Sequence, residues 1–420
     1  GTYSLLYRQL RSGSFREMGE EAGVRVTRGI GGALIDYDRD GDLDLFVANY
    51  VNWTRKADLE IDFRLAGLGR AYGAPNNFRG TDNHLYRNEG DGRFSDVSEA
   101  AGIQVRDPVS GLPVMSLYGA TRRPTPEMLE GLDVVLYDIQ DVGHRTYTFV
   151  SSLTYLMEAC EEAGVAVWVL DRPDPTGGHI VGGPMIDDDL LSFIGVHPVP
   201  QVYGMTPGEW ARMIRAERTP GIDLRVIPMD GWRRGMTFGE TGWIWVPTSQ
   251  HIPQWTTSYF YAMTGTIGEL GKVNVGVGTP NPFELIGQEW LDGVEFARRL
   301  NARDLPGVIF RPVSYSPRYA LGTGKMLHGV QIHISDYHAV ESARVLGALI
   351  AELAHVAPDK NLFADYLRED GSPSGFLKAL GQREIAEALA RNEVPPALLN
   401  PDSEAFRAFL QRREGYLVYE

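Results

Sequence analysis

The spacing of apolar residues changes twice along the chain and divides it into three segments. In residues 1–104, short apolar runs such as "ALI" and "LFVANY" flank acidic turns, a pattern typical of short strands. Residues 105–260 alternate unbroken apolar stretches with helical periodicity. Residues 261–420 begin with a Gly-rich stretch and continue with amphipathic helices and strands, which predicts an α+β domain.

The middle segment has the pattern of a parallel sheet. Its strands are not alternating in polarity, which indicates that helices cover both faces of the sheet. Ligands of such sheets bind beyond the carboxyl ends of the strands, so we expect a cleft there. The predicted strands are residues 112–119, 133–143, 165–178 and 224–229, and the predicted helices are 125–131, 146–164 and 206–217. The polar residues at the strand ends are Asp138, Asp141, Asp171 and Arg172.

The last segment is predicted to contain three amphipathic helices and two strands. Its glycines do not follow a strand in the order that a nucleotide-binding loop requires, so a nucleotide site is not expected. The helices are predicted within residues 292–303, 339–356 and 403–416, and the strands at 308–315 and 328–336.

An acidic stretch at residues 36–44 has the spacing of a calcium-binding loop. Carboxylates at positions 1, 3, 5 and 9, a main-chain carbonyl at 7 and Gly41 at position 6 suit the oxygen ligands of Ca²⁺. Position 12 is Val47 rather than Glu, so the loop is not that of a helix–loop–helix hand. A solvated acidic turn is the alternative. The expected ligands of this structural ion are Asp36, Asp38, Asp40, Asp42 and Asp44.

An internal repeat accompanies the acidic loop. "GSFREMGEEAGV" (13–24) matches "GRFSDVSEAAGI" (92–103) at an offset of 79 residues, as the positions of Phe15 and Phe94 show. The segment resembles FG-GAP/VCBS-type repeats of calcium-binding β-propellers. A propeller closes with about four to eight blades, and after Ile103 no second acidic loop follows. The repeat therefore predicts how residues 1–104 fold as a propeller fragment, and the function is expected elsewhere.

Composition limits the classes of partner. The 420 residues are 43% hydrophobic and 23% charged, which suffices for two or three ordinary domains. A net charge of −15 argues against nucleic acid as a partner. No apolar run reaches transmembrane length, and the sequence shows no signal peptide. With Cys160 as the single cysteine, no internal disulfide can form.

Linked motifs in the second and third segments carry a family resemblance. "GLPVMSLYGATRRPTPEMLEGLDVVLYDIQDVGHRTYT" (111–148), "VLDRPDPTGG" (169–178), "YGMTPGEWARM" (203–213), "PFELIGQEWLDG" (282–293) and "GYLVYE" (415–420) occur in that order. From about residue 107 to the end, the chain resembles the exo-β-N-acetylmuramidase family of NamZ-type glycosidases. The resemblance implies a Rossmann-like domain, a C-terminal domain, a cleft between them and removal of terminal N-acetylmuramic acid from peptidoglycan fragments. It implies no organic cofactor.

The chain departs from the family pattern in two places. Family members carry further strands and a "PEHG" motif before the matched segment, and the glutamate of that motif is the usual candidate for the catalytic acid. This sequence contains no Glu-His-Gly, so its Rossmann-like sheet is predicted to be incomplete. In the loop around residues 265–284, Val275, Val277 and Asn281 stand where many relatives have charged side chains.

Site residues follow from glycosidase chemistry together with the resemblance. Hydrolysis of a glycoside normally uses two carboxyl groups about 5–10 Å apart, one of them kept protonated. Arginines suit the lactyl carboxylate of muramic acid. The predicted catalytic residues are Asp138, Asp141 and Glu269. The predicted substrate-binding residues are Arg145, Tyr147, Asp171, Arg172, His251 and Glu284. Trp243, Trp245 and Trp255 are either core residues or sugar-stacking platforms.

Three functions are compatible with these observations. The first is a glycosidase acting on terminal N-acetylmuramic acid in the recycling of peptidoglycan outside the cytoplasm. The second is a sugar-binding relative without turnover, which the missing glutamate favours. The third is a calcium-dependent adhesion protein that works through residues 1–104. The partners expected from the first two are peptidoglycan-derived amino sugars.

Overall fold

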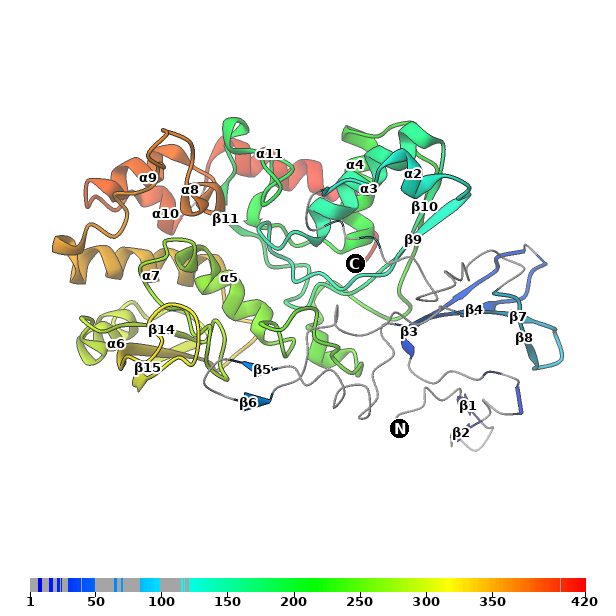
Figure 1. Ribbon diagram of the computed structural model, residues 1–420, viewed down its shortest axis with the longest axis horizontal. Coiled ribbons are helices and arrows are strands. Elements are labelled where there is room, and N and C mark those ends of the chain that lie inside the picture. The colour runs from blue at the N-terminus through cyan, green and yellow to red at the C-terminus, as the bar shows by residue number, and fades with distance from the viewer. Residues whose placement is uncertain are drawn as a thin grey trace. The chain divides into compact units, whose positions relative to one another are not determined.

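A computed structural model describes most of the chain after residue 120 and parts of the chain before it (Figure 1). The described residues fall into two compact units, 1–119 and 120–420. The ranges are 7–9, 15–17, 21–22, 24, 29–38, 40–49, 64–65, 69–70, 84–98, 115, 117, 121–400 and 402–420.

The first unit contains a four-stranded antiparallel sheet. Its strand order is β3-β4-β7-β8, with β3 at Gly29–Ile35, β4 at Asp44–Asn49, β7 at His84–Asn88 and β8 at Phe94–Asp96. The acidic loop joins β3 to β4, as predicted. Two short strand pairs complete the described part of this unit: β1 (Tyr7–Gln9) with β2 (Phe15–Glu17), and β5 (Arg64–Leu65) with β6 (Gly69–Arg70).

The two copies of the internal repeat meet at this sheet. The amide of Phe94 donates a hydrogen bond to the carbonyl of Ala22, with 2.7 Å between the nitrogen and the oxygen. Ala22 and Val24 pack with Val47 and Tyr86 in a small apolar cluster. The first copy therefore covers the sheet to which the second copy contributes a strand. The resemblance to a propeller blade stays a prediction.

The second unit starts with a parallel sheet of three strands in the order β13-β10-β9. The bounds are β9 Val134–Tyr137, β10 Ala166–Leu170 and β13 Leu224–Ile227. The helices between them are α2 Pro126–Leu129, α3 Phe149–Ala163 and α4 Pro207–Glu217, and β11 Gly182–Met185 pairs with β12 Pro200–Val202. Three of the four predicted strands are confirmed, and the predicted strand 112–119 lies outside the described residues except for 115 and 117.

Local signals in the sequence set the ends of these helices. α3 ends at Gly164, whose φ of 70° is favourable for glycine and lets its amide reach the carbonyls of Cys160 and Glu161. α4 begins with a capping box, in which Thr206 and Glu209 each bond with the other's main-chain amide. These caps fix the points at which the chain enters and leaves the sheet.

The predicted α+β arrangement of the last segment is confirmed. An antiparallel sheet has the order β14-β16-β15, with β14 at Leu285–Gln288, β15 at Val308–Tyr315 and β16 at Leu327–Ile334. Its helices are α5 Thr257–Gly268, α6 Gly293–Asn301, α7 Ser342–Val356, α8 Gly375–Leu380, α9 Arg383–Ala390, α10 Pro396–Leu399 and α11 Glu404–Glu414. Short 3₁₀ turns lie at Asp188–Leu190, Phe238–Glu240 and Pro358–Lys360.

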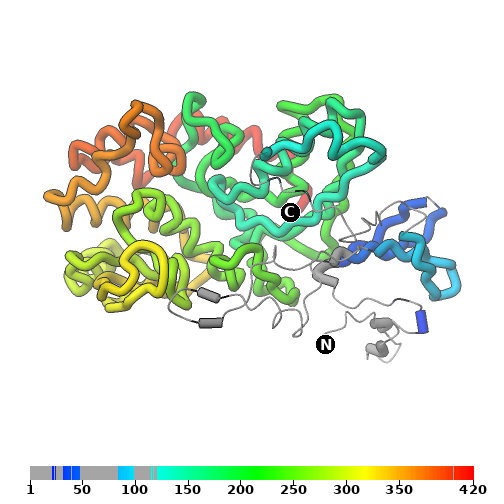
Figure 2. Tube along the Cα trace, viewed as in Figure 1, coloured from blue at the N-terminus to red at the C-terminus, as the bar shows by residue number. Residues whose placement is uncertain are grey.

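Two hydrophobic cores lie within the second unit. Each contains residues from both sides of the predicted boundary at residue 260. The first core surrounds the parallel sheet and includes Phe409 of α11, near the end of the chain. The second core includes Val142, Ile186 and Ile252 from the preceding segment. Figure 2 shows the C-terminal helix returning beside the elements of the parallel sheet. The chain therefore crosses between the cores more than once, which makes residues 120–420 one compact unit.

No helix in the described ranges has the length and apolar character needed to cross a membrane.

Candidate functional site

The carboxyl ends of β9 and β10 bring an aspartate and an arginine together. The two strands are parallel and adjacent, so Asp138, directly after β9, lies beside Arg172, two residues after β10. Nε of Arg172 is 2.7 Å from Oδ1 of Asp138, and Nη2 is 2.5 Å from the same oxygen. Their side chains keep 21% (Arg172) and 13% (Asp138) of their surface in solvent. The predicted shared edge is thus confirmed for these two residues.

Asp171 lies at the same edge but is buried in a different role. Its carboxylate accepts hydrogen bonds from the hydroxyl groups of Thr206 and Tyr419 and from the amide of Gly208, each at 2.7 Å. Burial raises its pKa to about 6 against these hydrogen bonds. Asp171 therefore links the start of α4 and the end of the chain to the sheet. The structure does not support the predicted contact between Asp171 and a substrate.

Asp141 is also buried rather than presented at the edge. It is 2% exposed, and its Oδ2 accepts hydrogen bonds from the hydroxyl of Tyr203 and from the amide of Gly143. Oδ1 has no hydrogen-bond partner among the described residues. Burial raises the pKa of Asp141 to about 7, which keeps the carboxyl group partly protonated near neutral pH.

A second buried acid, Asp174, lies beside the main chain at Gly143. Oδ1 of Asp174 accepts hydrogen bonds from the amide and hydroxyl of Thr176. A Cβ atom at position 143 would lie 2.6 Å from this oxygen, and Gly143 has a φ of 74°, so only glycine allows the approach. Burial raises the pKa of Asp174 to about 6, and its charge in turn raises that of Asp141.

Arg145 points into the protein interior instead of toward a ligand. It is 1% exposed, and its two terminal nitrogens donate to the main-chain carbonyls of Pro184, Val199, Ala379 and Leu380 at 2.9–3.2 Å. Burial lowers its pKa to about 9. The predicted contact between Arg145 and a substrate carboxylate is not supported, because its terminal donors are already used to join separate stretches of main chain.

Tyr147 and His251 lie in polar contacts between loops. The hydroxyl of Tyr147 is 2.7 Å from Oγ1 of Thr248. Nε2 of His251 is 3.1 Å from the hydroxyl of Tyr319, and the two rings stack with centroids 6.1 Å apart. Burial lowers the pKa of His251, which favours the neutral imidazole. Both residues remain candidates for contact with a ligand.

The two candidate glutamates of the last segment differ in their surroundings. Glu269 follows α5, is exposed on the surface, and has a carboxylate oxygen 2.5 Å from the point that a Cβ at Gly375 would occupy. Desolvation by nearby protein raises its pKa. Glu284 accepts a hydrogen bond from Nδ2 of Asn281 at 3.0 Å. Asn281, which stands where many relatives have a charged side chain, thus holds Glu284 in place.

The three tryptophans, for which the sequence allows either a core or a sugar-stacking role, differ in their surroundings. Trp245 and Trp255 pack against the second core, and Nε1 of Trp245 donates to the carbonyl of Ile252. Trp243 keeps 50% of its surface exposed, and the adjacent Ile244 is also exposed. Trp243 is therefore the one of the three whose ring is available for stacking on a sugar.

In the first unit, the acidic loop brings three of its five aspartates together. Ligand oxygens of Asp36, Asp38 and Asp40 all lie within 4.8 Å of one another, which fits oxygen ligands about 2.3–2.6 Å from a shared Ca²⁺. Oδ1 of Asp36 is buried without a hydrogen-bond partner in the described part of the chain. Partial desolvation, followed by the charge of Asp40, raises the pKa of Asp38. These residues fit a bound cation.

Asp44 departs from the predicted ligand set. It is fully buried, and its two oxygens accept hydrogen bonds from the amides of Tyr37 and Asn88 at 3.0 and 2.8 Å. The carboxylate thereby ties the acidic loop to β7 and acts in the fold. Asp42 is exposed, and its amide donates to Oδ1 of Asp40 at 2.9 Å.

Sequence reasoning missed two residues of the sheet edge, Tyr203 and Asp174. Asp174 stands four residues after β10, in the "DRPDPTGG" motif, so its place after a buried strand was a usable signal. Tyr203 directly follows β12, and its bond with Asp141 joins residues 62 positions apart. That pairing depends on how β12 packs and leaves no mark in the local sequence.

The fold and this edge define an α/β protein with a parallel sheet, an ion pair at its carboxyl end and buried carboxyl groups beneath. The family models described as exo-β-N-acetylmuramidase NamZ, N-terminal and C-terminal, match residues 92–256 and 259–419. The chain therefore belongs to the exo-β-N-acetylmuramidase NamZ family. The match begins at residue 92, ahead of the predicted start near 107, and so includes β8 of the first unit.

Individual relatives agree with this assignment. The chain is 36% identical to the peptidoglycan β-N-acetylmuramidase NamZ of Bacillus subtilis (strain 168) over 313 residues, 74% of each chain. Two crystal structures of DUF1343 family proteins from Bacteroides fragilis NCTC 9343 are similar in fold, at 36% identity with a TM-score of 0.69 and at 26% identity with a TM-score of 0.58. Both alignments cover 75% of this chain and 82% of the other.

Proposed function

We propose that the chain binds peptidoglycan fragments ending in N-acetylmuramic acid at the carboxyl edge of its parallel sheet, outside the cytoplasm, and hydrolyses them slowly or not at all. The observation that carries this proposal is the partly exposed Asp138–Arg172 pair at that edge, in a chain 36% identical to a β-N-acetylmuramidase. Ligands of open parallel sheets bind at this position.

Arg172 is the residue best suited to the carboxylate of the ligand. Its Nε and Nη2 face Asp138, and Nη1 has no acceptor among the residues that the structure describes. A planar guanidinium with a free nitrogen can add a charge-assisted bond to a lactyl carboxylate. The buried Arg145 offers no comparable surface. Trp243 supplies an exposed ring for the apolar face of a sugar.

Asp141 and Glu269 each have the raised pKa that a general acid needs, but each lacks another property of a general acid. Asp141 has a pKa raised to about 7, yet it is buried and bonded to Tyr203. Glu269 has a raised pKa and an exposed side chain, but it belongs to a different element from the ion pair. General acid–base help is typically worth about 10²–10⁴-fold in rate, so the proposal expects weak turnover at best.

The test measures binding and turnover separately. Binding of N-acetylmuramic acid by titration calorimetry is expected, together with little or no release from a chromogenic β-N-acetylmuramide. Arg172→Gln is expected to weaken binding about 10-fold, whereas Arg233→Gln, a change of an exposed arginine outside the sheet edge, is the matched control. Normal steady-state turnover that Glu269→Gln abolishes would refute the inactive assignment and establish Glu269 as the acid.

A second proposal concerns the first unit. We propose that the acidic loop binds one structural Ca²⁺ through Asp36, Asp38 and Asp40. The clustered oxygens and the unpartnered buried Oδ1 of Asp36 support it. Titration calorimetry is expected to show one site, weakened by Asp38→Ala, while Asp91→Ala in the exposed β7–β8 turn leaves it unchanged. An absence of calcium uptake by the unmutated chain would reject the site.

A further inference from the structure

The segment after α11, residues 416–420, lies at the carboxyl edge of the parallel sheet. The hydroxyl of Tyr419 donates a hydrogen bond to Oδ2 of Asp171, directly after β10, and accepts one from the amide of Met229, two residues after β13. The two distances are 2.7 and 2.9 Å. Because β10 lies between β13 and β9, this hydroxyl joins two strand ends on the side of β10 opposite to Asp138.

The other oxygen of Asp171 holds the main chain of Arg172. Oδ1 accepts hydrogen bonds from the amide of Arg172 at 2.9 Å and from the amide of Gly208, at the start of α4, at 2.7 Å. The hydroxyl of Thr206 shares Oδ2 with that of Tyr419. Because one carboxylate carries all four hydrogen bonds, a change in its orientation also displaces the amide of Arg172.

Tyr419 is itself held through both its ring and its main chain. The residue is 9% exposed, and its ring lies edge-on to that of Trp232 with the centroids 4.9 Å apart. Arg234 donates to its carbonyl at 3.1 Å, and its amide donates to Glu209 at 3.4 Å. Burial, followed by the charge of Asp171, raises the pKa of Tyr419, so the phenol stays protonated and remains a donor.

The side chain of Arg172 is held from the opposite side. Its Nε and Nη2 pair with Asp138, which orients the guanidinium. The start of the same side chain is placed by the main-chain amide that Asp171 holds. A guanidinium that binds a ligand carboxylate must be kept close to its productive geometry by the residues around it. Both ends of Arg172 therefore matter for binding.

We propose that Tyr419 is a positioning residue of the ligand site: through the carboxylate of Asp171 it holds Arg172 where Arg172 can bind the carboxylate of a muramic acid. The inference rests on the function proposed for the sheet edge. It adds to that site a residue 248 positions from Asp171, which acts through its neighbours and not by touching the ligand.

A double-mutant cycle tests whether Tyr419 acts through Arg172. N-acetylmuramic acid is titrated by calorimetry into the full chain, Tyr419→Phe, Arg172→Gln and the double variant. Tyr419→Phe keeps the ring, removes the hydroxyl and is expected to weaken binding about 5-fold. The double variant is expected to bind no more weakly than Arg172→Gln alone, because the side chain that Tyr419 positions is already absent.

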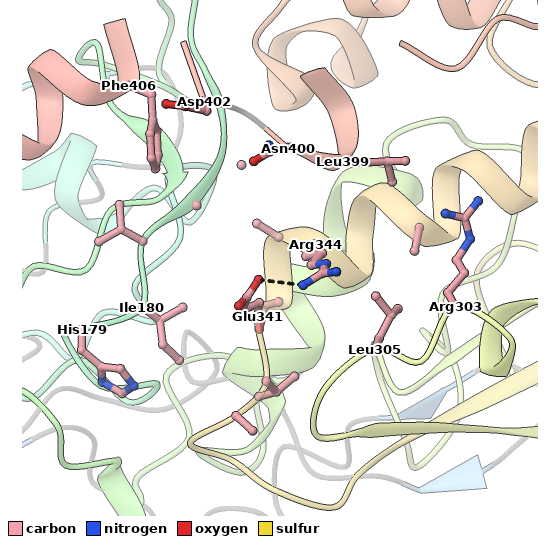
Figure 3. A pocket seen from close by; sticks show the side chains of 18 of the residues that line it. His179, Ile180, Arg303, Leu305, Glu341, Arg344, Leu399, Asn400, Asp402 and Phe406 are labelled. Carbon is pink, nitrogen blue, oxygen red and sulfur yellow. Dashed lines mark ion pairs between the residues drawn. The ribbon is translucent and has the colours of Figure 1, made fainter. Parts of the chain in front are cut away.

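Tyr416→Phe is the matched control. It removes the hydroxyl of a second tyrosine of the same segment, one that donates to Glu217 at 2.9 Å, and should leave binding unchanged. Binding at another place would not imitate the expected result. The cavity of about 930 Å³ that Figure 3 shows, near β11 and the starts of α7 and α11, is lined by none of Asp171, Arg172 and Tyr419.

Hydrogen exchange gives a second measurement that requires no ligand. Exchange of the Arg172 amide, followed by NMR on the ¹⁵N-labelled full chain, is expected to be about 5-fold faster in Tyr419→Phe than in the parent chain. The reason is that the carboxylate to which this amide donates has lost one of its donors. The rate in Tyr416→Phe should equal that of the parent chain.

The two measurements separate failure of this inference from failure of the proposed function. Parent-like binding by Tyr419→Phe, additive losses in the cycle, or an Arg172 amide that exchanges at the parent rate in Tyr419→Phe each overturn the positioning role. If no chain binds N-acetylmuramic acid, the proposed function fails, and exchange at Arg172 still decides whether Tyr419 holds that residue. Thermal unfolding of every variant above the temperature of the titration shows that lost binding does not come from lost fold.

Discussion

Two regions rich in aspartate have opposite surroundings in this protein. In the loop between β3 and β4, Asp38, Asp40 and Asp42 are exposed, and the carboxylates of Asp38 and Asp40 accept hydrogen bonds from neighbouring amides of the same loop. After β9 and β10, Asp141 and Asp171 are buried and accept hydrogen bonds from hydroxyl groups 62 and 248 residues away. The same residue type, placed within a few residues of a strand end in both regions, is exposed in one and holds the fold together in the other.

The difference shows that burial, rather than position after a strand, decides the role of an aspartate. A buried carboxyl group needs hydrogen-bond donors, and its desolvation shifts its pKa, whereas an exposed carboxyl group is accessible to a ligand from solvent. Four changes test this contrast, beginning with the largest expected effect.

The largest effect is expected from pH. The pKa of Asp141 is about 7 in the folded chain and about 3.8 when unfolded, so between these values the folded state binds more protons. The free energy of unfolding of the second unit therefore falls as pH rises from 4 to 7, by up to about 4 kcal/mol from this group.

Urea unfolding at several pH values checks this dependence. Asp141→Asn is expected to flatten the fall, because the carboxamide does not ionise and its oxygen can still accept from Tyr203. Asp133→Asn, at an exposed position before β9, should leave the fall as it is. An identical pH slope in the parent chain and in Asp141→Asn would contradict the assignment.

The next effect compares one carboxylate from each region. Asp171→Ala leaves the hydroxyl groups of Thr206 and Tyr419 and the amide of Gly208 without their acceptor, which is expected to lower the free energy of unfolding by about 3 kcal/mol. Asp42→Ala, at an exposed position of the loop, is expected to change it by less than about 0.5 kcal/mol. Equal losses for both variants in urea unfolding would remove the distinction.

A third change tests whether a buried aspartate of the first unit stabilises its fold as the buried aspartates of the second unit do. Asp44→Ala removes the acceptor of the amides of Tyr37 and Asn88 and is expected to cost about 2 kcal/mol. Hydrogen exchange at these two amides should accelerate about 30-fold if it follows local opening. Exchange that stays at the parent rate would mean that Asp44 contributes nothing to the loop.

The smallest effect on stability is expected at the partly exposed ion pair. Asp138→Ala should cost about 1 kcal/mol or less in urea unfolding, because ion pairs in contact with solvent contribute little. The parallel variant Arg172→Ala should behave in the same way. A loss of about 3 kcal/mol in either variant would show that this pair stabilises the fold, as the buried carboxyl groups do, and would argue against its role as a ligand site.

The sequence predicted elements well where periodicity is local. The strand expected at residues 308–315 is β15 without a shift, and the helix expected at 206–217 is α4 with Thr206 as its cap. The apolar periodicity, the capping residues and the turn residues that define an element all lie within it or within a few residues of its ends. The shared edge of Asp138 and Arg172 followed from the parallel arrangement of two such strands.

The interior of the candidate site was not predictable in the same way. The sequence places Asp171 and Arg172 side by side, yet one is enclosed by Thr206 and Tyr419 and the other reaches solvent. The partners that enclose Asp171 belong to α4 and to the end of the chain. Contacts at such separations depend on packing of whole elements, and single-sequence periodicity carries no record of them.

Arg145 also bears on the order in which the chain can become folded during synthesis. Two of its carbonyl acceptors, Ala379 and Leu380, lie 234 and 235 residues further along the sequence. Until the ribosome has released that part of the chain, Nη2 of this arginine lacks the acceptors that it has in the finished protein. Burying it earlier would leave a charged donor unpaired, at considerable cost. The interior around Arg145 therefore cannot be completed before α8 has been synthesised, although the strands that surround it come much earlier in the sequence.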